Sequence, residues 1–140
     1  MNTTSGDNKA AVRACFGAAS KGNFEAFESI LTPDYVLHPE DIRGAAGLAE
    51  MVSVYRSAIS DLHVDVEHQF TEGDYVATRV TIRGTHDGDL MGTPPTGRTV
   101  SFSALTISRC ENGRIAEEWE IADTMSLLRQ VGAAPDPVAG

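Results

Sequence analysis

Hydrophobic and polar positions along the chain follow two different periods, and the change falls near residue 60. In the first part, apolar residues recur every three or four positions, as they do on one side of an amphipathic helix. Leu48, Val52, Tyr55 and Ile59 show this spacing clearly. The pattern predicts helices over about residues 7–20, 24–32 and 45–59, with Pro33 ending the second and a short extended segment at residues 35–38.

From residue 62 onward apolar and polar residues alternate instead, which is typical of half-buried β-strands. Asn112 and Gly113 favour a hairpin turn, because both residues tolerate a positive φ. The pattern predicts strands over residues 62–70, 75–85, 99–109 and 114–122, and a closing helical turn over residues 124–130. Three helices followed by a meander of strands indicate an α+β fold, in which an antiparallel sheet curves around the helices and leaves a ligand cavity.

The length of 140 residues and the hydrophobic content of 41% fit one domain with one core. We expect this domain to span residues 8–132. Flexible segments are predicted at residues 1–7 and 133–140, where glycine and proline disfavour regular structure.

The charge balance limits the classes of partner. There are 20 acidic and 11 basic residues, which gives a formal net charge of −9. Phosphates and anionic membranes bind clustered positive charge, so neither nucleic acid nor a membrane is expected as a partner. No secretory leader and no apolar run of about 20 residues is visible, so we predict a cytoplasmic protein. In that setting Cys15 and Cys110 are expected to be free, buried thiols.

Asp123 is the first candidate for chemistry. It follows the last predicted strand, on the same alternating face as Ile115, Trp119 and Ile121. This face is mostly apolar, so we expect it to point into the cavity, where burial would raise the pKa of a carboxyl toward the range useful for proton transfer. Asp123 also suits the N-cap of the closing helix, because Thr, Met, Ser and Leu follow it. The residues alone leave both roles open.

The histidines are weaker candidates. His38 and His86 each end an extended segment near the expected cavity, where an imidazole could orient a substrate carbonyl or share a proton. A polar residue at a strand end accounts for each equally well. His63 falls on the polar face of its strand and His68 on the apolar face. No set of residues has metal-ligand spacing and no glycine-rich loop opens a helix, so neither a metal nor a nucleotide cofactor is expected.

Several motifs resemble the SnoaL-like polyketide cyclase family. Residues 84–97 read GTHDGDLMGTPPTG, which is similar to a strand-and-loop motif of that family. Residues 112–115 read NGRI and residues 127–132 read LLRQVG, with Trp119 and Asp123 between them. The earlier positions that fit are residues 35–38, Gly44, Tyr55, Arg56 and residues 60–62. The likeness therefore covers about residues 8–132.

This resemblance implies the cone-shaped α+β barrel of the nuclear-transport-factor-like superfamily. It also implies an interior pocket, no metal, no bound cofactor and a homo-oligomer. In the polyketide cyclases an aspartate late in the last strand is the general acid/base of an intramolecular aldol closure, and Asp123 falls on that position. The residues expected to line the substrate pocket are His38, His86, Trp119, Ile121 and Tyr55.

One departure from the family pattern bears on the reaction. The cyclases carry a run rich in histidine and arginine before the aspartate, whereas residues 117–122 read EEWEIA here. An aldol enolate needs hydrogen-bond donors at its oxygen. The sequence therefore favours a cofactor-independent hydroxylation of an anthracycline-type aromatic polyketide, with Asp123 as the base and a separate reductase as a further partner that could supply reduced substrate. Aldol ring closure is the first alternative.

Two further alternatives belong to other classes. One is a different acid/base reaction, such as steroid-like isomerisation or epoxide hydrolysis, and the other is a non-catalytic small-molecule-binding or dimerisation domain. A homodimer is expected through the outer face of the sheet, where side chains of mixed charge could pair across a two-fold axis. The residues expected on that face are Arg79, Thr81, Arg83, Glu118 and Glu120.

Overall fold

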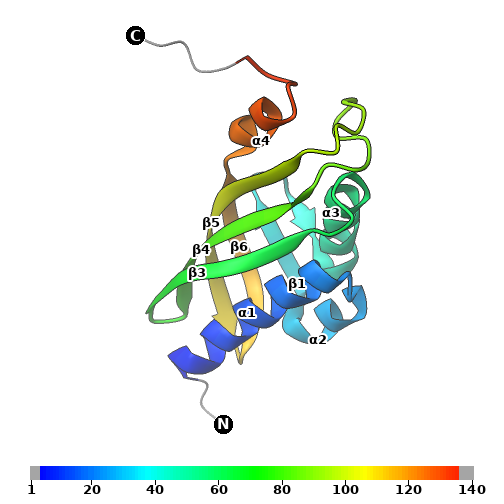
Figure 1. The fold of residues 1–140 in the computed structure, drawn as a ribbon. Coiled ribbons are helices and arrows are strands. Elements are labelled where there is room, and N and C mark those ends of the chain that lie inside the picture. Colours follow the sequence, from blue (N-terminus) through cyan, green and yellow to red (C-terminus); the bar gives the residue numbers. More distant parts are fainter. Residues whose placement is uncertain (1–3, 136–140) are drawn as a thin grey trace.

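The computed structural model describes residues 4–135 and has the predicted α+β architecture (Figure 1). The helices are α1 (Ser5–Lys21), a 3-10 turn η1 (Phe24–Ala26), α2 (Phe27–Ile30), α3 (Gly44–Ala58) and α4 (Thr124–Gln130). The strands are β1 (Leu31–His38), β2 (Ile42–Arg43), β3 (His63–Glu72), β4 (Tyr75–Thr85), β5 (Thr99–Glu111) and β6 (Arg114–Ala122). The elements predicted at residues 75–85, 114–122 and 124–130 have the bounds found in the structure.

The strands form one six-stranded sheet in the order β2-β1-β6-β5-β4-β3. The prediction of a wholly antiparallel sheet is wrong, because β1 pairs with β6 in parallel. The second helix is also shorter than predicted, and Pro33 lies inside β1 instead of ending a helix. The ladder to β6 is irregular between Leu31 and Val36, so Pro33 falls where no regular backbone bond is required. The sheet stays open, and its curvature produces the cone shape.

Two β-bulges reverse the alternation of side chains along their strands. In β3, Val66 pairs with Val80 but His68 pairs with Arg79, which leaves Glu67 as an extra residue. In β6, Ile115 pairs with Cys110 but Glu117 pairs with Arg109, which leaves Ala116 as the extra residue. Beyond each bulge, the side chains that simple alternation assigns to the inner face point outward, and the others point inward.

The exposure of the side chains beyond the two bulges is the reverse of what alternation predicts. His68 and Phe70 are exposed, although the sequence pattern placed both on the apolar inner face. The exposed fraction of Phe70 is 69%. Glu118 and Glu120 were expected on the outer face, but Glu118 is buried and Glu120 is largely buried. The predicted outward positions of Arg79 and Arg83 agree with the structure, in which both are exposed.

Helices α1 and α3 cover different parts of the concave face of the sheet. The long helix α1 packs against β3, β4 and β6, and α3 packs against β1. The Thr4 hydroxyl and the Asp7 carboxylate form a reciprocal capping box, so α1 begins at Ser5, two residues before the predicted start. Cys15 and Cys110 are buried and free, as predicted. Residues 1–3 and 136–140 of the predicted flexible segments lie outside the described residues. Over the described range, no helix has the length and apolarity required to cross a membrane.

Candidate functional site

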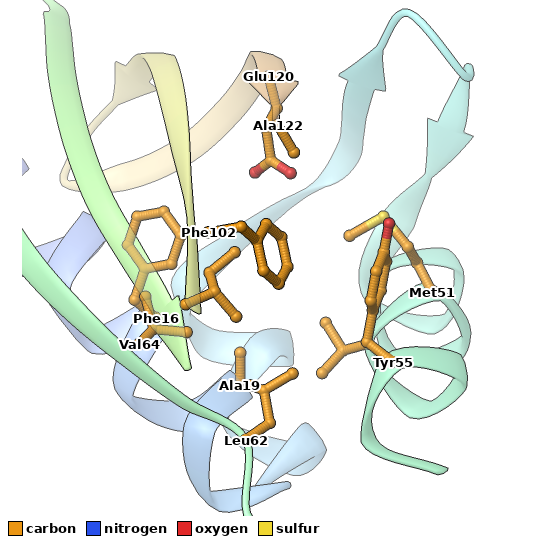
Figure 2. A pocket seen from close by; sticks show the side chains of 11 residues that line it. Phe16, Ala19, Met51, Tyr55, Leu62, Val64, Phe102, Glu120 and Ala122 are labelled. Atoms are coloured by element: carbon orange, nitrogen blue, oxygen red, sulfur yellow. The ribbon is translucent and has the colours of Figure 1, made fainter. Parts of the chain in front are cut away.

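An apolar cavity lies between the concave face of the sheet and helices α1 and α3 (Figure 2). It encloses about 520 Å³ of empty space, part of which is open to solvent. Almost all of its wall is aliphatic or aromatic. The lining residues are Phe16, Ala19, Met51, Val52, Tyr55, Leu62, Val64, Ile82, Phe102, Glu120 and Ala122.

Glu120 is the one carboxyl side chain that lines this cavity. It lies on β6 beyond the bulge at Ala116, which turns it toward the helices. Thr106 on the neighbouring strand donates a long hydrogen bond of 3.3 Å to Glu120 Oε2. Burial in these apolar surroundings, together with the nearby carboxyls of Glu118 and Glu40, raises the pKa of Glu120 to about 7. A carboxyl with this pKa can both accept and return a proton near neutral pH.

Three spaces meet at Glu120. Besides the main cavity, it borders a deeper recess whose other walls include Cys15, Leu37 and Leu48. It also borders an opening between the turn at Pro39 and the beginning of α4. A ligand that enters through this opening therefore passes the Glu120 carboxyl on its way to the apolar interior.

Tyr55 on α3 contributes a second polar group to the cavity. Its ring stands on the wall formed by α3, while Glu120 enters from the sheet (Figure 2). Burial, followed by the negative charges of Glu120 and Glu40, raises the pKa of the Tyr55 phenol, so the hydroxyl keeps its proton. Among the described residues, burial and the charges of Glu120 and Glu40 act on this hydroxyl, and no hydrogen-bond partner does. It is therefore free to donate to a ligand oxygen.

Asp123 lies outside this cavity. It is exposed, and its Oδ1 accepts a hydrogen bond of 3.1 Å from the backbone N–H of Ser126, which makes it the N-cap of α4. It borders a shallow groove on the outer face of the sheet together with Arg79 and Leu105. The capping role that the sequence left open is thus the one that the geometry shows.

Trp119 and Ile121 also lie on the outer face. Their exposed fractions are 38% and 78%, so the prediction that this face of β6 points into the cavity is wrong. The reason is the extra residue at Ala116, which shifts the alternation by one position. Of the six site residues expected from the sequence, Tyr55 lines the cavity, and Ile121 borders the opening near Pro39 that leads to Glu120.

The two histidines are apart from the cavity and from each other. His38 is half-buried on the outer face, where its Nε2 lies 2.7 Å from Glu117 Oε2 and its ring stacks on Trp119. His86 is fully buried at the base of the loop between β4 and β5, with Nδ1 3.0 Å from Thr96 Oγ1. Neither is a lining residue of the cavity. The structure therefore brings neither of these two histidines to the wall of the cavity.

Sequence reasoning missed Glu120, which alternation had assigned to solvent. One signal was present in the sequence: Ile115 and Ala116 are consecutive apolar residues, and both are buried. Two buried neighbours in a half-buried strand indicate a bulge, after which the inward positions become even-numbered. Among residues 4–135, no cluster of three or more histidine, cysteine or acidic side chains is arranged to hold a metal ion.

Comparisons with known proteins agree with this architecture. The aklanonic acid methyl ester cyclase DnrD of Streptomyces peucetius is 28% identical over 103 residues, which cover 73% of this chain and 71% of that protein. The nogalonic acid methyl ester cyclase of Streptomyces nogalater is 28% identical over 121 residues, covering 82% and 90% of the two chains.

A solved structure and a family model extend the comparison. The structure of AclR from Streptomyces galilaeus, a suggested hydroxylase, superimposes with a TM-score of 0.86 at 28% identity and covers 96% of this chain and 87% of AclR. Residues 9–131 match the model of the SnoaL-like polyketide cyclase family. This match spans most of the chain, so the protein belongs to the SnoaL-like polyketide cyclase family.

Proposed function

We propose that this protein tailors an aromatic polyketide by acid/base catalysis, without a cofactor, and that Glu120 is the base. The observation that carries the proposal is a carboxyl with a pKa of about 7 inside an otherwise apolar cavity. Burying a carboxyl costs stability, and carboxyls with a strongly shifted pKa are concentrated at functional sites, where a value near 7 suits proton transfer at neutral pH.

Intramolecular aldol ring closure is the reaction that these groups serve best. Glu120 removes a proton from the carbon next to a carbonyl, and the resulting enolate carbon attacks a second carbonyl of the same molecule. A carbon–carbon bond forms, and the attacked oxygen becomes a hydroxyl by taking up the proton that Glu120 holds. The Tyr55 hydroxyl donates a hydrogen bond to the oxygen on which negative charge develops. The product is an isomer of the substrate.

Tyr55 can supply the hydrogen-bond donor that ring closure needs and that the sequence of β6 lacks. The run before Asp123 has no histidine or arginine, but the donor for an enolate oxygen can come from α3 instead of β6. The similarity to two methyl ester cyclases of Streptomyces supports the same choice. The catalytic role of Asp123 stays a prediction of the sequence, and the assay described below tests it beside Glu120.

Hydroxylation is the second candidate, and the similarity to AclR supports it. In this reaction Glu120 deprotonates a hydroquinone, and the electron-rich ring carbon forms a bond to dioxygen. Loss of one water from the hydroperoxide leaves a hydroxyquinone. The hydroquinone itself supplies the two electrons that reduce the second oxygen atom to water, so the proposed step uses no flavin or metal. A separate reductase would have to form the hydroquinone from the corresponding quinone before this reaction.

Mass spectrometry of the products distinguishes these reactions. The purified protein would be incubated with aklanonic acid methyl ester, and separately, in air, with a chemically reduced anthraquinone polyketide. Ring closure gives a product of unchanged mass, whereas hydroxylation adds one oxygen relative to the quinone. Either product should depend on Glu120, with Glu120→Gln lowering the rate by roughly 10²–10⁴-fold. Full activity of Glu120→Gln would refute the proposed base, and loss of turnover in Asp123→Asn alone would support the aspartate.

A further inference from the structure

A second carboxyl, Glu118, is buried behind Glu120. The hydroxyl of Tyr35 on β1 donates a hydrogen bond of 2.6 Å to Glu118 Oε1, and the hydroxyl of Ser108 on β5 donates one of 2.5 Å to Oε2. The exposed fractions of Tyr35, Ser108 and Glu118 are 0%, 0% and 6%. Three strands thus converge on one carboxyl that solvent does not reach.

Glu118 and Glu120 belong to the same interior space. They are two positions apart on β6, so both point to the concave face, and both border the deep recess behind the main cavity. Among residues 4–135, no salt bridge reaches either carboxyl. The other titratable groups around Glu120 carry no positive charge and are Cys15 on α1, Tyr35 on β1, Tyr55 on α3 and Glu40 in the turn after β1.

The charge of Glu118 helps to raise the pKa of Glu120 to about 7, so the two carboxyls titrate as a pair that keeps one proton below that pH. Burial raises the pKa of Glu118 above the ordinary glutamate value, and the hydrogen bonds from Ser108 and Tyr35 offset only part of that rise. Glu120 has only the long bond from Thr106 to stabilise its charge. Of the two carboxyls, Glu118 therefore stabilises a negative charge better, because two short hydrogen bonds from hydroxyl donors replace part of its lost solvation.

We propose that Glu118, held as a buried anion by the hydroxyls of Tyr35 and Ser108, is a positioning residue that places the shared proton of the pair on Glu120. This proposal rests on the proposed role of Glu120 as the acid/base. The fixed charge of Glu118 makes Glu120 a stronger base once it has lost its proton. It also keeps the exchangeable proton at the carboxyl that faces the cavity, because Glu118 itself does not line the cavity.

A purely structural role for the same hydrogen bonds makes a different prediction. If Tyr35, Glu118 and Ser108 only join β1, β5 and β6, their removal lowers stability and leaves the titration of Glu120 where it was. If Glu118 acts as a fixed anion, its neutralisation lowers the midpoint at which Glu120 ionises. The titration of Glu120 therefore separates the two roles, whereas a loss of activity would not.

The test is a carboxyl-carbon NMR titration of the full chain labelled with ¹³C-glutamate, without substrate. The Glu120 resonance is assigned from its loss in Glu120→Gln, and the Glu118 resonance from its loss in Glu118→Gln. We expect Glu118 to ionise at a lower pH than Glu120 in the natural protein. In Glu118→Gln the Glu120 midpoint should fall by at least about one pH unit, a tenfold change in its ionised-to-protonated ratio. Glu117→Gln is the matched control, because Glu117 adjoins Glu118 in sequence but lies on the outer face with His38 and Arg109.

Two more variants keep the test decisive if Glu118→Gln does not fold. Tyr35→Phe and Ser108→Ala each remove one donor to Glu118, which moves the shared proton toward Glu118 and lowers the Glu120 midpoint in the same direction by a smaller amount. An unchanged Glu120 midpoint in the folded variants, or a Glu118 resonance that ionises after Glu120, would overturn the proposal. The titration needs no substrate, so it can succeed or fail independently of the proposed reaction.

Discussion

Glu117 and Glu120 lie three positions apart on β6, and their carboxyl pKa values are shifted in opposite directions. Hydrogen bonding to His38, together with the hydrogen bond and charge of Arg109, lowers the pKa of Glu117. Burial raises the pKa of Glu120 to about 7. The residue type is the same, so the difference comes from solvent and partners alone. At the scale of single residues, this contrast distinguishes the candidate base from a surface carboxylate.

The pH dependence of catalysis should follow Glu120. A base must be ionised to act, so kcat/KM should rise with pH through about 7 and level off above that value. A pH series of initial rates with the accepted polyketide measures this midpoint, and Glu117→Gln should leave it unchanged. A midpoint near 4.5, the ordinary glutamate value, would contradict the assignment of Glu120.

The free energy of unfolding should also depend on the ionisation of Glu120, but it should fall as the pH rises, whereas kcat/KM should increase. The folded state binds the Glu120 proton more tightly than the unfolded chain, because the pKa is about 7 instead of about 4.5. The stabilisation by the protonated side chain is complete below about pH 4.5, decreases as the pH rises, and is absent above about pH 7. The full difference amounts to about 3 kcal/mol at most.

Glu120→Gln removes this titration, so the variant should be more stable than the natural protein at pH 8 and similar to it at pH 4.5. Urea unfolding at both pH values measures the change. Glu117→Gln provides the control, because its carboxylate is stabilised in the folded state and its removal should give no gain at pH 8. A Glu120→Gln variant that loses both activity and stability at pH 8 would indicate a structural role instead.

At the scale of elements, β6 decides which side chains reach the cavity. The bulge at Ala116 turns Glu118, Glu120 and Ala122 inward and sends Trp119 to the outer face. The strand ends at Ala122, and Asp123 begins α4 by accepting the hydrogen bond of the Ser126 N–H. A single strand thus supplies the buried carboxyls, part of the outer surface and the connection to the last helix.

The capping role of Asp123 leads to a prediction for α4. Asp123→Ala removes the acceptor for the Ser126 N–H and should lower the free energy of unfolding by about 1 kcal/mol, whereas Asp123→Asn keeps an N-cap and should be close to neutral. Thermal or urea unfolding measures both variants. We expect Asp123→Asn to retain turnover within a few-fold. Loss of turnover with normal stability would instead support the catalytic role that the sequence predicted.

At the scale of the whole molecule, the inner and outer faces of the sheet have different tasks. The inner face and the helices enclose the cavity, while the outer face carries exposed apolar side chains on four neighbouring strands. These residues are Phe70, Tyr75, Leu105, Ile107, Trp119 and Ile121. Glu118 and Glu120 were expected on this face but point inward, whereas Arg79 and Arg83 are exposed on it as predicted. The outer face therefore combines exposed apolar side chains with charged ones.

The exposed apolar side chains on this face still favour the predicted homodimer, because contiguous exposed apolar surface marks an interaction site. Leu105→Glu, near the centre of this face, should convert a dimer to a monomer of 14.9 kDa. Light scattering after size-exclusion chromatography measures the mass. Val54→Glu is the control, because Val54 is 59% exposed but lies on α3. A natural protein that is monomeric at all accessible concentrations would refute the dimer.

The sequence by itself determined the local elements. The change from helical to alternating periodicity located α1, α3 and the four long strands, because local hydrophobic period depends on how each element packs against a single core. The family motifs led to the cone-shaped α+β fold. The buried, free cysteines also followed from composition. The expectation that Tyr55 lines the pocket came with the family resemblance, and Tyr55 does line the cavity.

Only the tertiary structure decided which carboxyl lies in the cavity. The consecutive apolar residues Ile115 and Ala116 are the one local sign of the bulge in β6, and only the observed strand pairing shows that the extra residue exchanges the two faces. The pairing of β1 with β6 likewise depends on a contact between distant segments, and so does the meeting of Tyr35, Ser108 and Glu118. The pKa of Glu120 depends on burial by helices and strands far apart in sequence, so it exists only in the folded molecule.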